Sequence, residues 1–188
     1  AEGKPLLVNV KRLLRLPLAC FGFVVLLIVV LSAILAPWVA PYDPLEQNID
    51  ARLQGPSGAH LLGTDELGRD VLSRIIYGSR ISLLVGIGAV SFGTVVGVTL
   101  GLVAAYARGV LDEVIMRAMD AMFAFPSLIL AIGLVAVLGG GLINVIVAIG
   151  VANIPWMARI VRSQALSVRE RDFVTAARSV GGKDLHII

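Results

Sequence analysis

Long apolar stretches alternate with short polar connections along the chain. Four of the stretches approach or exceed the length of about 20 residues that a helix needs to cross the hydrocarbon core of a bilayer. They cover residues 18–36, 81–107, 121–138 and 142–157. The pattern predicts an all-α membrane protein, built as a multi-span helical bundle.

The polar connection between the first two stretches changes character along its length. It begins with Pro37, Pro41 and Pro44 and contains the turn-forming run 55–58 (GPSG), which predicts an irregular loop. From Thr64 onward the pattern becomes amphipathic. A helical face is shared by Leu67, Val71, Ile75 and Ile76, and an i, i+4 ion pair is expected between Asp70 and Arg74. We expect an amphipathic helix on the outer surface, ended by Gly78 before the second span.

Small residues recur at every fourth position of the second apolar stretch. Such a ladder lets another transmembrane helix approach closely, either a helix of a partner subunit or one of this chain. The sequence leaves both alternatives open. The ladder consists of Ala89, Gly93, Gly97, Gly101 and Ala105.

Proline and asparagine interrupt the third and fourth stretches. Pro126 removes a backbone hydrogen bond and predicts a kink in the third. Asn144 and Asn153 are the clearest polar residues of the fourth, near Pro155. Because amides are costly in hydrocarbon, these two side chains are expected to line a transport path or to form hydrogen bonds between helices.

A charged group precedes the third apolar stretch. The spacing allows Arg117 to form an ion pair with Asp120 or with Glu113 at the inner membrane interface. A structural pair is the main interpretation, and a proton relay is the alternative.

The polar and basic segment 171–188 follows the last apolar stretch. One face of a short helix is shared by Phe173, Ala176, Ala177 and Val180, and Gly181 with Gly182 ends that helix. Positive charge flanks the face at Arg171, Arg178 and Lys183. This pattern is typical of a docking element for another protein.

Composition supports a membrane protein and charge suggests its orientation. The 188 residues are 57% apolar and only 15% charged, and mean hydropathy is +0.91, which excludes an ordinary water-soluble domain. Residues 1–16 carry four basic residues against one acid, and the part after Met157 carries six against three. Both ends are therefore expected in the cytoplasm and the segment 37–80 outside.

The sequence offers little catalytic or metal chemistry. No phosphate-binding loop is present, since Gly182-Lys183 is followed by Asp184, and His60 and His186 fall on opposite sides of the expected topology. The group Asp65, Glu66, Arg69 and Asp70 is interpreted as the solvated face of the external helix. The single cysteine, Cys20, is interpreted as a packing residue.

Two motifs resemble one known family. Residues 60–74 (HLLGTDELGRDVLSR) and 77–83 (YGSRISL) resemble the C-type permease subunits of bacterial and archaeal dipeptide and oligopeptide ABC importers. Residues 172–178 (DFVTAAR), followed by Gly181, are similar to the cytoplasmic EAA motif of such permeases.

The resemblance implies a non-catalytic subunit with the type I permease fold in a bacterial or archaeal inner membrane. Its partners would be a homologous second permease, two ABC ATPases and an extracytoplasmic solute-binding protein. ATP and magnesium would bind to the ATPases, and no cofactor to this chain. The ATPase-docking residues would be Phe173, Ala176, Ala177, Arg178, Val180 and Gly181, in a coupling loop at about 160–188. The expected division is 1–79, with the first span and external segment, and 80–188, the permease domain.

Two departures from the family pattern affect these expectations. Thr175 replaces the glutamate that gives the motif its name. The sequence also begins at Ala1 and ends at Ile188, with four of an expected six spans, so we expect an incomplete chain. Alternatives are a permease for nickel or another small solute, and a secondary transporter or channel without an ATPase; a membrane enzyme is disfavoured.

Overall fold

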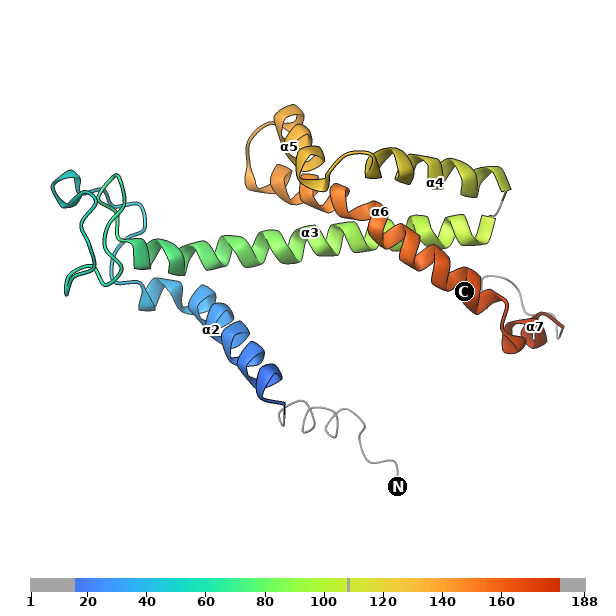
Figure 1. The fold of residues 1–188 in the computed structure, drawn as a ribbon, viewed down its shortest axis with the longest axis horizontal. Coiled ribbons are helices and arrows are strands. Elements are labelled where there is room, and N and C mark those ends of the chain that lie inside the picture. The colour runs from blue at the N-terminus through green and yellow to red at the C-terminus, as the bar shows by residue number, and fades with distance from the viewer. Residues whose placement is uncertain (1–15, 108, 180–188) are drawn as a thin grey trace, which may run out of the picture. The chain divides into compact units, whose positions relative to one another are not determined.

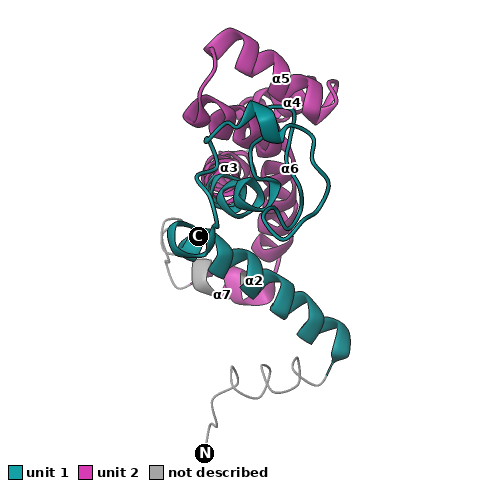
Figure 2. Ribbon diagram, turned by 90° about the vertical axis from the view of Figure 1, so that its left-hand side faces the viewer, with its two compact units in different colours: residues 1–84 teal, residues 85–188 magenta. Residues whose placement is uncertain are grey.

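The computed structural model describes residues 16–107 and 109–179, except for the side chains of Thr175, Ala177 and Arg178. The described part is helical, without strands, and forms two compact units, Ala1–Leu84 and Val85–Ile188 (Figure 2). Three helices are long and apolar enough to cross a membrane, and a bent pair could form a fourth span. The predicted helical membrane fold is confirmed.

The first unit contains α2 (Pro17–Val39) and the beginning of α3 (Val71–Ala107) (Figure 1). Pro17 begins α2, where its missing N–H costs no hydrogen bond. Almost all the apolar side chains of α2 are exposed, but Ala33 and Ala36 are buried, and the Ser32 hydroxyl donates to the Ser79 hydroxyl of α3 at 3.3 Å. The rest of α2 therefore presents an apolar surface suited to lipid.

The segment 40–70 is irregular apart from the short 3₁₀ helix η1 (Ile49–Ala51). Backbone hydrogen bonds join its distant parts: Leu53 N–H to Asp65 O at 3.1 Å, and Thr64 N–H to Gln54 O at 3.0 Å. Gly68 allows the closest approach, because its φ is +71° and a Cβ would lie 1.7 Å from the carbonyl oxygen of Asn48. The predicted irregular loop is thus a compact, internally bonded segment.

The separate external helix predicted from Thr64 to Gly78 is wrong. Helix α3 (Val71–Ala107) begins seven residues later and passes through Gly78 without interruption. An interior glycine costs a helix only about 1 kcal/mol relative to alanine, so one glycine does not end a helix of 37 residues. At 1.5 Å per residue α3 is about 55 Å long, longer than the hydrocarbon core of about 30 Å.

The third predicted span is broken more sharply than a kink. Helix α4 (Gly109–Phe123) and helix α5 (Ser127–Leu138) meet at 93° across the break that contains Pro126 (Figure 1). Proline lacks an N–H and forces the preceding residue out of the helical conformation, which explains the position of the break. The disruption at Pro126 is confirmed, but a single helix over 121–138 is wrong.

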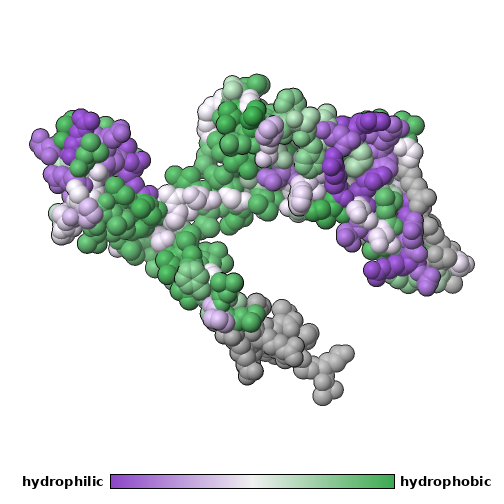
Figure 3. All heavy atoms as spheres, viewed as in Figure 1, coloured by the Kyte–Doolittle hydropathy of each residue, from purple (hydrophilic) through white to green (hydrophobic). Residues whose placement is uncertain are grey.

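The fourth apolar stretch forms the start of α6 (Leu142–Arg169), which continues twelve residues beyond the predicted end. Pro155 lies buried inside this helix without ending it. A short turn then leads to α7 (Asp172–Ser179). In the second unit, hydrophilic residues gather over α4 and the C-terminal part of α6, whereas α5 is almost entirely apolar (Figure 3).

Candidate functional site

The small-residue ladder of α3 packs against α6 of the same chain. A Cβ added at Gly97 would lie 2.7 Å from the Cβ of Met157, and one at Gly101 would lie 2.6 Å from the carbonyl oxygen of Ala158. At Gly93 the nearest atom is the carbonyl oxygen of Gly150, at 2.8 Å. The two alanines of the ladder, Ala89 and Ala105, are buried as well. Of the two alternatives, the structure therefore supports packing within this chain.

A small apolar cluster joins α4 to α6. Met119 of α4 is buried against Ile154 and Ala158 of α6. Ala158 also lies beside Gly97 and Gly101 of α3, so this part of α6 is covered from two sides. The central turns of α6 are consequently the best packed part of the second unit.

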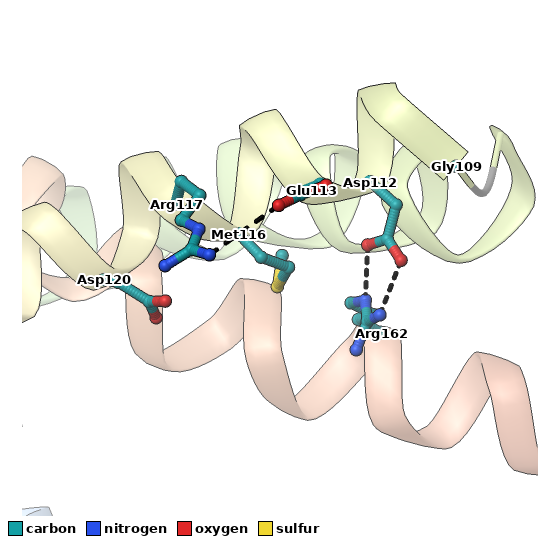
Figure 4. Close-up of a pocket in the computed structure, with 7 residues that line it drawn as sticks. All are labelled: Gly109, Asp112, Glu113, Met116, Arg117, Asp120 and Arg162. Atoms are coloured by element: carbon teal, nitrogen blue, oxygen red, sulfur yellow. Dashed lines mark hydrogen bonds and ion pairs between the residues drawn. The ribbon is translucent and has the colours of Figure 1, made fainter.

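Two aspartate–arginine pairs also join α4 to α6, and Figure 4 shows one of them, Asp112 with Arg162. The guanidinium of Arg162 on α6 donates through Nε to Asp112 Oδ1 at 2.6 Å and through Nη2 to Asp112 Oδ2 at 2.5 Å. This two-pronged arrangement is the strongest geometry for an arginine–carboxylate pair. Arg159, one turn earlier on α6, pairs with Asp120 of α4 and lies 4.3 Å from the centre of the Phe123 ring. We call the two contacts the α4–α6 ion pairs.

The predicted pairing of Arg117 is correct for one of its two candidates. Arg117 lies 3.7 Å from Glu113 on the same helix, and both side chains are largely exposed, at 77% and 70%. Asp120 pairs with Arg159 instead. The charged groups of α4 border a shallow pocket of about 310 Å³ together with Met116 and Arg162 (Figure 4).

The end of α6 is also bound to the end of α3. Nη1 of Arg169 donates to the carbonyl oxygen of Ala105 at 3.2 Å. The last carbonyls of a helix have no partner within that helix, so an arginine from another element is a favourable donor there.

Helix α7 exposes one apolar residue and buries its neighbour. Phe173 is 60% exposed, whereas Val174 is only 1% exposed. Ala176 is exposed too. The remaining members of the predicted docking face lie outside the described residues or side chains: Ala177, Arg178, Val180 and Gly181. The segment 180–188, with Gly182, Lys183 and His186, is likewise outside.

The segment 40–70 holds its own polar network together with the first turn of α3. Asp70 is buried and caps the first turn of α3, accepting the Ser73 N–H at 2.8 Å and the Ser73 hydroxyl at 2.8 Å; its other oxygen lies 3.0 Å from His60 Nδ1. Burial alone would raise the pKa of Asp70, but the hydrogen bonds from Ser73 and His60 outweigh it and lower that pKa. Serine and histidine both contact the aspartate, which ties the loop around His60 to the first turn of α3.

Asp65 organises the neighbouring turn. It accepts the backbone N–H groups of Leu67 and Arg69 and pairs with the guanidinium groups of Arg69 and Arg74. Burial opposes ionisation, but these hydrogen bonds and the charge of Arg69 lower the pKa of Asp65 to about 2. The predicted Asp70–Arg74 ion pair is therefore wrong, because the guanidinium of Arg74 pairs with Asp65 instead.

The interpretation of this group as a solvated helix face is also wrong for Asp70, which is 3% exposed, although Glu66 is exposed. Among the described residues, no group of three histidine, cysteine or acidic side chains is placed to hold a metal ion.

Comparison with known families gives two matches. Residues 97–188 match the family described as binding-protein-dependent transport system inner membrane component. Residues 7–56 match the N-terminal transmembrane domain of oligopeptide transport permease C. The chain belongs to this permease family.

Curated relatives agree with the family matches. The di/tripeptide transport system permease protein of Pseudomonas aeruginosa is 45% identical over 89% of this chain and 57% of the relative. The dipeptide transport system permease protein of Alkalihalophilus pseudofirmus is 44% identical over 95% of this chain and 59% of the relative. The glutathione transport system permease protein of Pectobacterium atrosepticum is 42% identical over 95% of this chain and 60% of the relative. The chain therefore spans about three fifths of the length of the curated relatives it matches.

The two asparagines of this permease chain bond to backbone carbonyls. Nδ2 of Asn144 donates to the carbonyl oxygens of Leu138 at 2.9 Å and Gly139 at 3.1 Å, which ties the first turn of α6 to the end of α5. Nδ2 of Asn153 donates to Ile149 O at 2.9 Å within α6, and its side chain is exposed. Asn144 thus joins two helices, as the second alternative expects, while path lining by either residue stays a prediction.

Sequence reasoning missed the α4–α6 ion pairs and the cap at Asp70. The run Asp70-Val71-Leu72-Ser73 places a capping residue before an apolar helix, and that signal was available in the sequence. Nothing local links Asp112 to Arg162, since fifty residues separate them.

Proposed function

We propose that this chain is part of the transmembrane subunit of an ATP-driven importer for dipeptides or oligopeptides. The family match and the names of the relatives support this function. The proposed partners are a second, homologous permease, two ABC ATPases and a solute-binding protein on the outer face. ATP and magnesium act in the ATPases, and this chain performs no chemistry.

The observation that carries the proposal is the exposed apolar residue of α7. Phe173 and Ala176, spaced i, i+3, are both exposed on one side of α7, and this helix lies in the part of the chain that matches the transport family, so we attribute the exposed face to a partner that covers it. The side chain of Val174 is buried, and Asp172 begins the helix after the two residues that follow α6. We infer that α7 is the coupling helix and that it docks on an ATPase.

The orientation is part of the proposal. Basic residues near the ends of the spans support a cytoplasmic N-terminus and a cytoplasmic α7, with the segment 40–70 outside. The orientation is measured with two variants, Ala59→Cys and Ser167→Cys, each in a Cys20→Ser background. A membrane-impermeant maleimide then labels only the cysteine that is accessible from the side where it is added. Labelling of the Ala59 position only from the outside supports the orientation, and labelling of the Ser167 position from that side contradicts it.

The test of docking uses two neighbours on α7. Phe173→Ala in the assembled transporter is expected to reduce the amount of co-purified ATPase about tenfold, because buried aromatic anchors dominate interfaces. Its melting temperature stays unchanged, since Phe173 makes little contact within the chain.

The matched control is Val174→Ala. It removes a buried side chain and is expected to lower the melting temperature of the protein. ATPase recovery at the wild-type level with Phe173→Ala contradicts the assignment of α7.

The class of solute is tested separately, in proteoliposomes that carry the complete transporter. Uptake of a labelled dipeptide, compared with uptake of Ni²⁺, identifies it.

A further inference from the structure

The α4–α6 ion pairs differ in exposure: the Asp120 and Arg159 side chains are about half exposed, at 55% and 48%, whereas the other pair is more enclosed. The Asp112 and Arg162 side chains are only 18% and 31% exposed and meet through two hydrogen bonds. Met119, Ile154 and Ala158 already supply an apolar contact between the same two helices. Apolar contact is non-directional and permits sliding and rotation, whereas a two-pronged ion pair fixes both.

The two pairs attach α4 to α6 at two separate levels. Asp112 and Asp120 are eight residues apart on α4, a distance of about 12 Å along the helix. Their partners Arg162 and Arg159 lie three residues apart on α6, and Met116 lies between Asp112 and Asp120 (Figure 4). Two attachment points prevent α4 from pivoting about either one.

Helix α7 follows α6 after a short turn. Hydrogen bonds close that turn, from Arg171 N–H to Val168 O at 3.1 Å and from Val174 N–H to Arg171 O at 3.0 Å. Val174 of α7 is also buried. At the other end of the assembly, α4 leads through the break at Pro126 into α5, and Asn144 ties α5 back to α6.

We propose that α7, α6, α4 and α5 move as one lever, and that the α4–α6 ion pairs are the positioning contacts that transmit a displacement of α7 to α5. The inference rests on the proposed function, because it is the docked ATPase that displaces α7. It assigns to Asp112, Arg162, Asp120 and Arg159 a role in coupling and not in transport chemistry.

The experiment measures the spacing of α5 and α6 in the assembled transporter. Spin labels are placed at Ile132 of α5, which is 61% exposed, and Val168 of α6, which is 40% exposed, in a Cys20→Ser background. The distance between them is measured by pulsed electron resonance without nucleotide and after trapping with ATP and vanadate. With the ion pairs intact, the distance is expected to stay the same in both states.

The first variant, Asp112→Asn with Arg162→Gln, removes both charges and so leaves no unpaired charge between the helices. After trapping, its label distance is expected to shift and broaden, because α6 moves without carrying α4 and α5. The second variant, Asp112→Arg with Arg162→Asp, exchanges the charges and is expected to restore a single, unchanged distance. Glu113→Gln with Arg117→Gln is the matched control, since this exposed pair lies on α4 alone.

Two results overturn the lever. One is a distance that changes on trapping in the unmodified transporter. The other is an amide variant that behaves like the Glu113 and Arg117 control while still binding its ATPase. Failure of the ATPase to co-purify with the unmodified protein is a different result, and it refutes the proposed function itself.

Discussion

The irregular segment 40–70 and the contact between α3 and α6 are held together by different means. In the segment, polar side chains provide much of the cohesion. Asp65 and Asp70 accept hydrogen bonds from backbone N–H groups and from a serine, and they pair with a histidine and two arginines. In the helix contact, cohesion depends on close approach of the two backbones, which is possible because Gly93, Gly97 and Gly101 have no side chains.

The difference follows from the solvent of each region. In water, charged and polar groups can be used freely, and a loop with few apolar residues relies on them. Between helices in lipid no hydrophobic driving force favours association, so close van der Waals contact provides the energy. The segment should therefore respond to the removal of charge and to acid, and the helix contact to the addition of volume.

The largest effect is expected from Gly97→Leu. The first carbon of the new side chain already meets Met157 Cβ at 2.7 Å and Ile154 O at 3.0 Å, so the two helices must separate. Overpacking of this kind is expected to destabilise the protein by about 3 kcal/mol. Thermal unfolding followed by circular dichroism in lipid nanodiscs measures the loss.

Gly86→Leu is the control on the same helix. A Cβ at Gly86 meets no atom within 4 Å, so this variant should unfold near the wild-type temperature. Equal loss in the two variants would show that the effect does not come from the contact with α6, since leucine is a better helix former than glycine at both positions.

A smaller effect is expected from Asp70→Ala in the polar region. The change removes the cap of α3 and the partner of His60, which should cost about 1 to 2 kcal/mol locally. Hydrogen exchange at the first turn of α3 is expected to accelerate about tenfold, since 1.4 kcal/mol corresponds to a factor of ten. Glu66→Gln, at an exposed position, should leave that exchange unchanged.

Acid should produce the smallest and most gradual effect, confined to the segment. The pKa of Asp65 falls from 3.8 to about 2 in the folded protein, so folding favours the ionised carboxylate. Its stabilisation is complete above about pH 4 and is lost as the pH falls toward 2.

Hydrogen exchange in the segment, corrected for the intrinsic effect of pH, measures that loss. Asp65→Asn should reduce the acid dependence and leave the part that Asp70 causes, since the pKa of Asp70 is lowered too. An unchanged acid profile in this variant would show that Asp65 makes no contribution.

The sequence was sufficient to predict those structural features that depend on local geometry. Apolar length identified the membrane helices, the i, i+4 ladder identified the close contact of α3, and Pro126 marked the break before α5. It misled at Gly78, because helix continuation over many residues outweighs the small cost of one glycine.

The candidate site was only partly predictable. The exposed side of α7 followed from helical spacing around Phe173. The pairing of Arg159 and Arg162 with α4 did not, because it depends on how two helices far apart in the sequence are set against each other. The hydropathy pattern placed Asp112 in the polar connection between the second and third apolar stretches. It therefore gave no reason to expect that Asp112 would pair with a residue of another helix.

The break before α5 has a consequence for hydration. No side chain caps this helix, and a helix leaves its first N–H groups without internal partners. Hydrocarbon tolerates no such unsatisfied backbone, so in a bilayer the start of α5 must face water or another polypeptide. The break at Pro126 therefore marks a point on the protein that lipid tails do not reach.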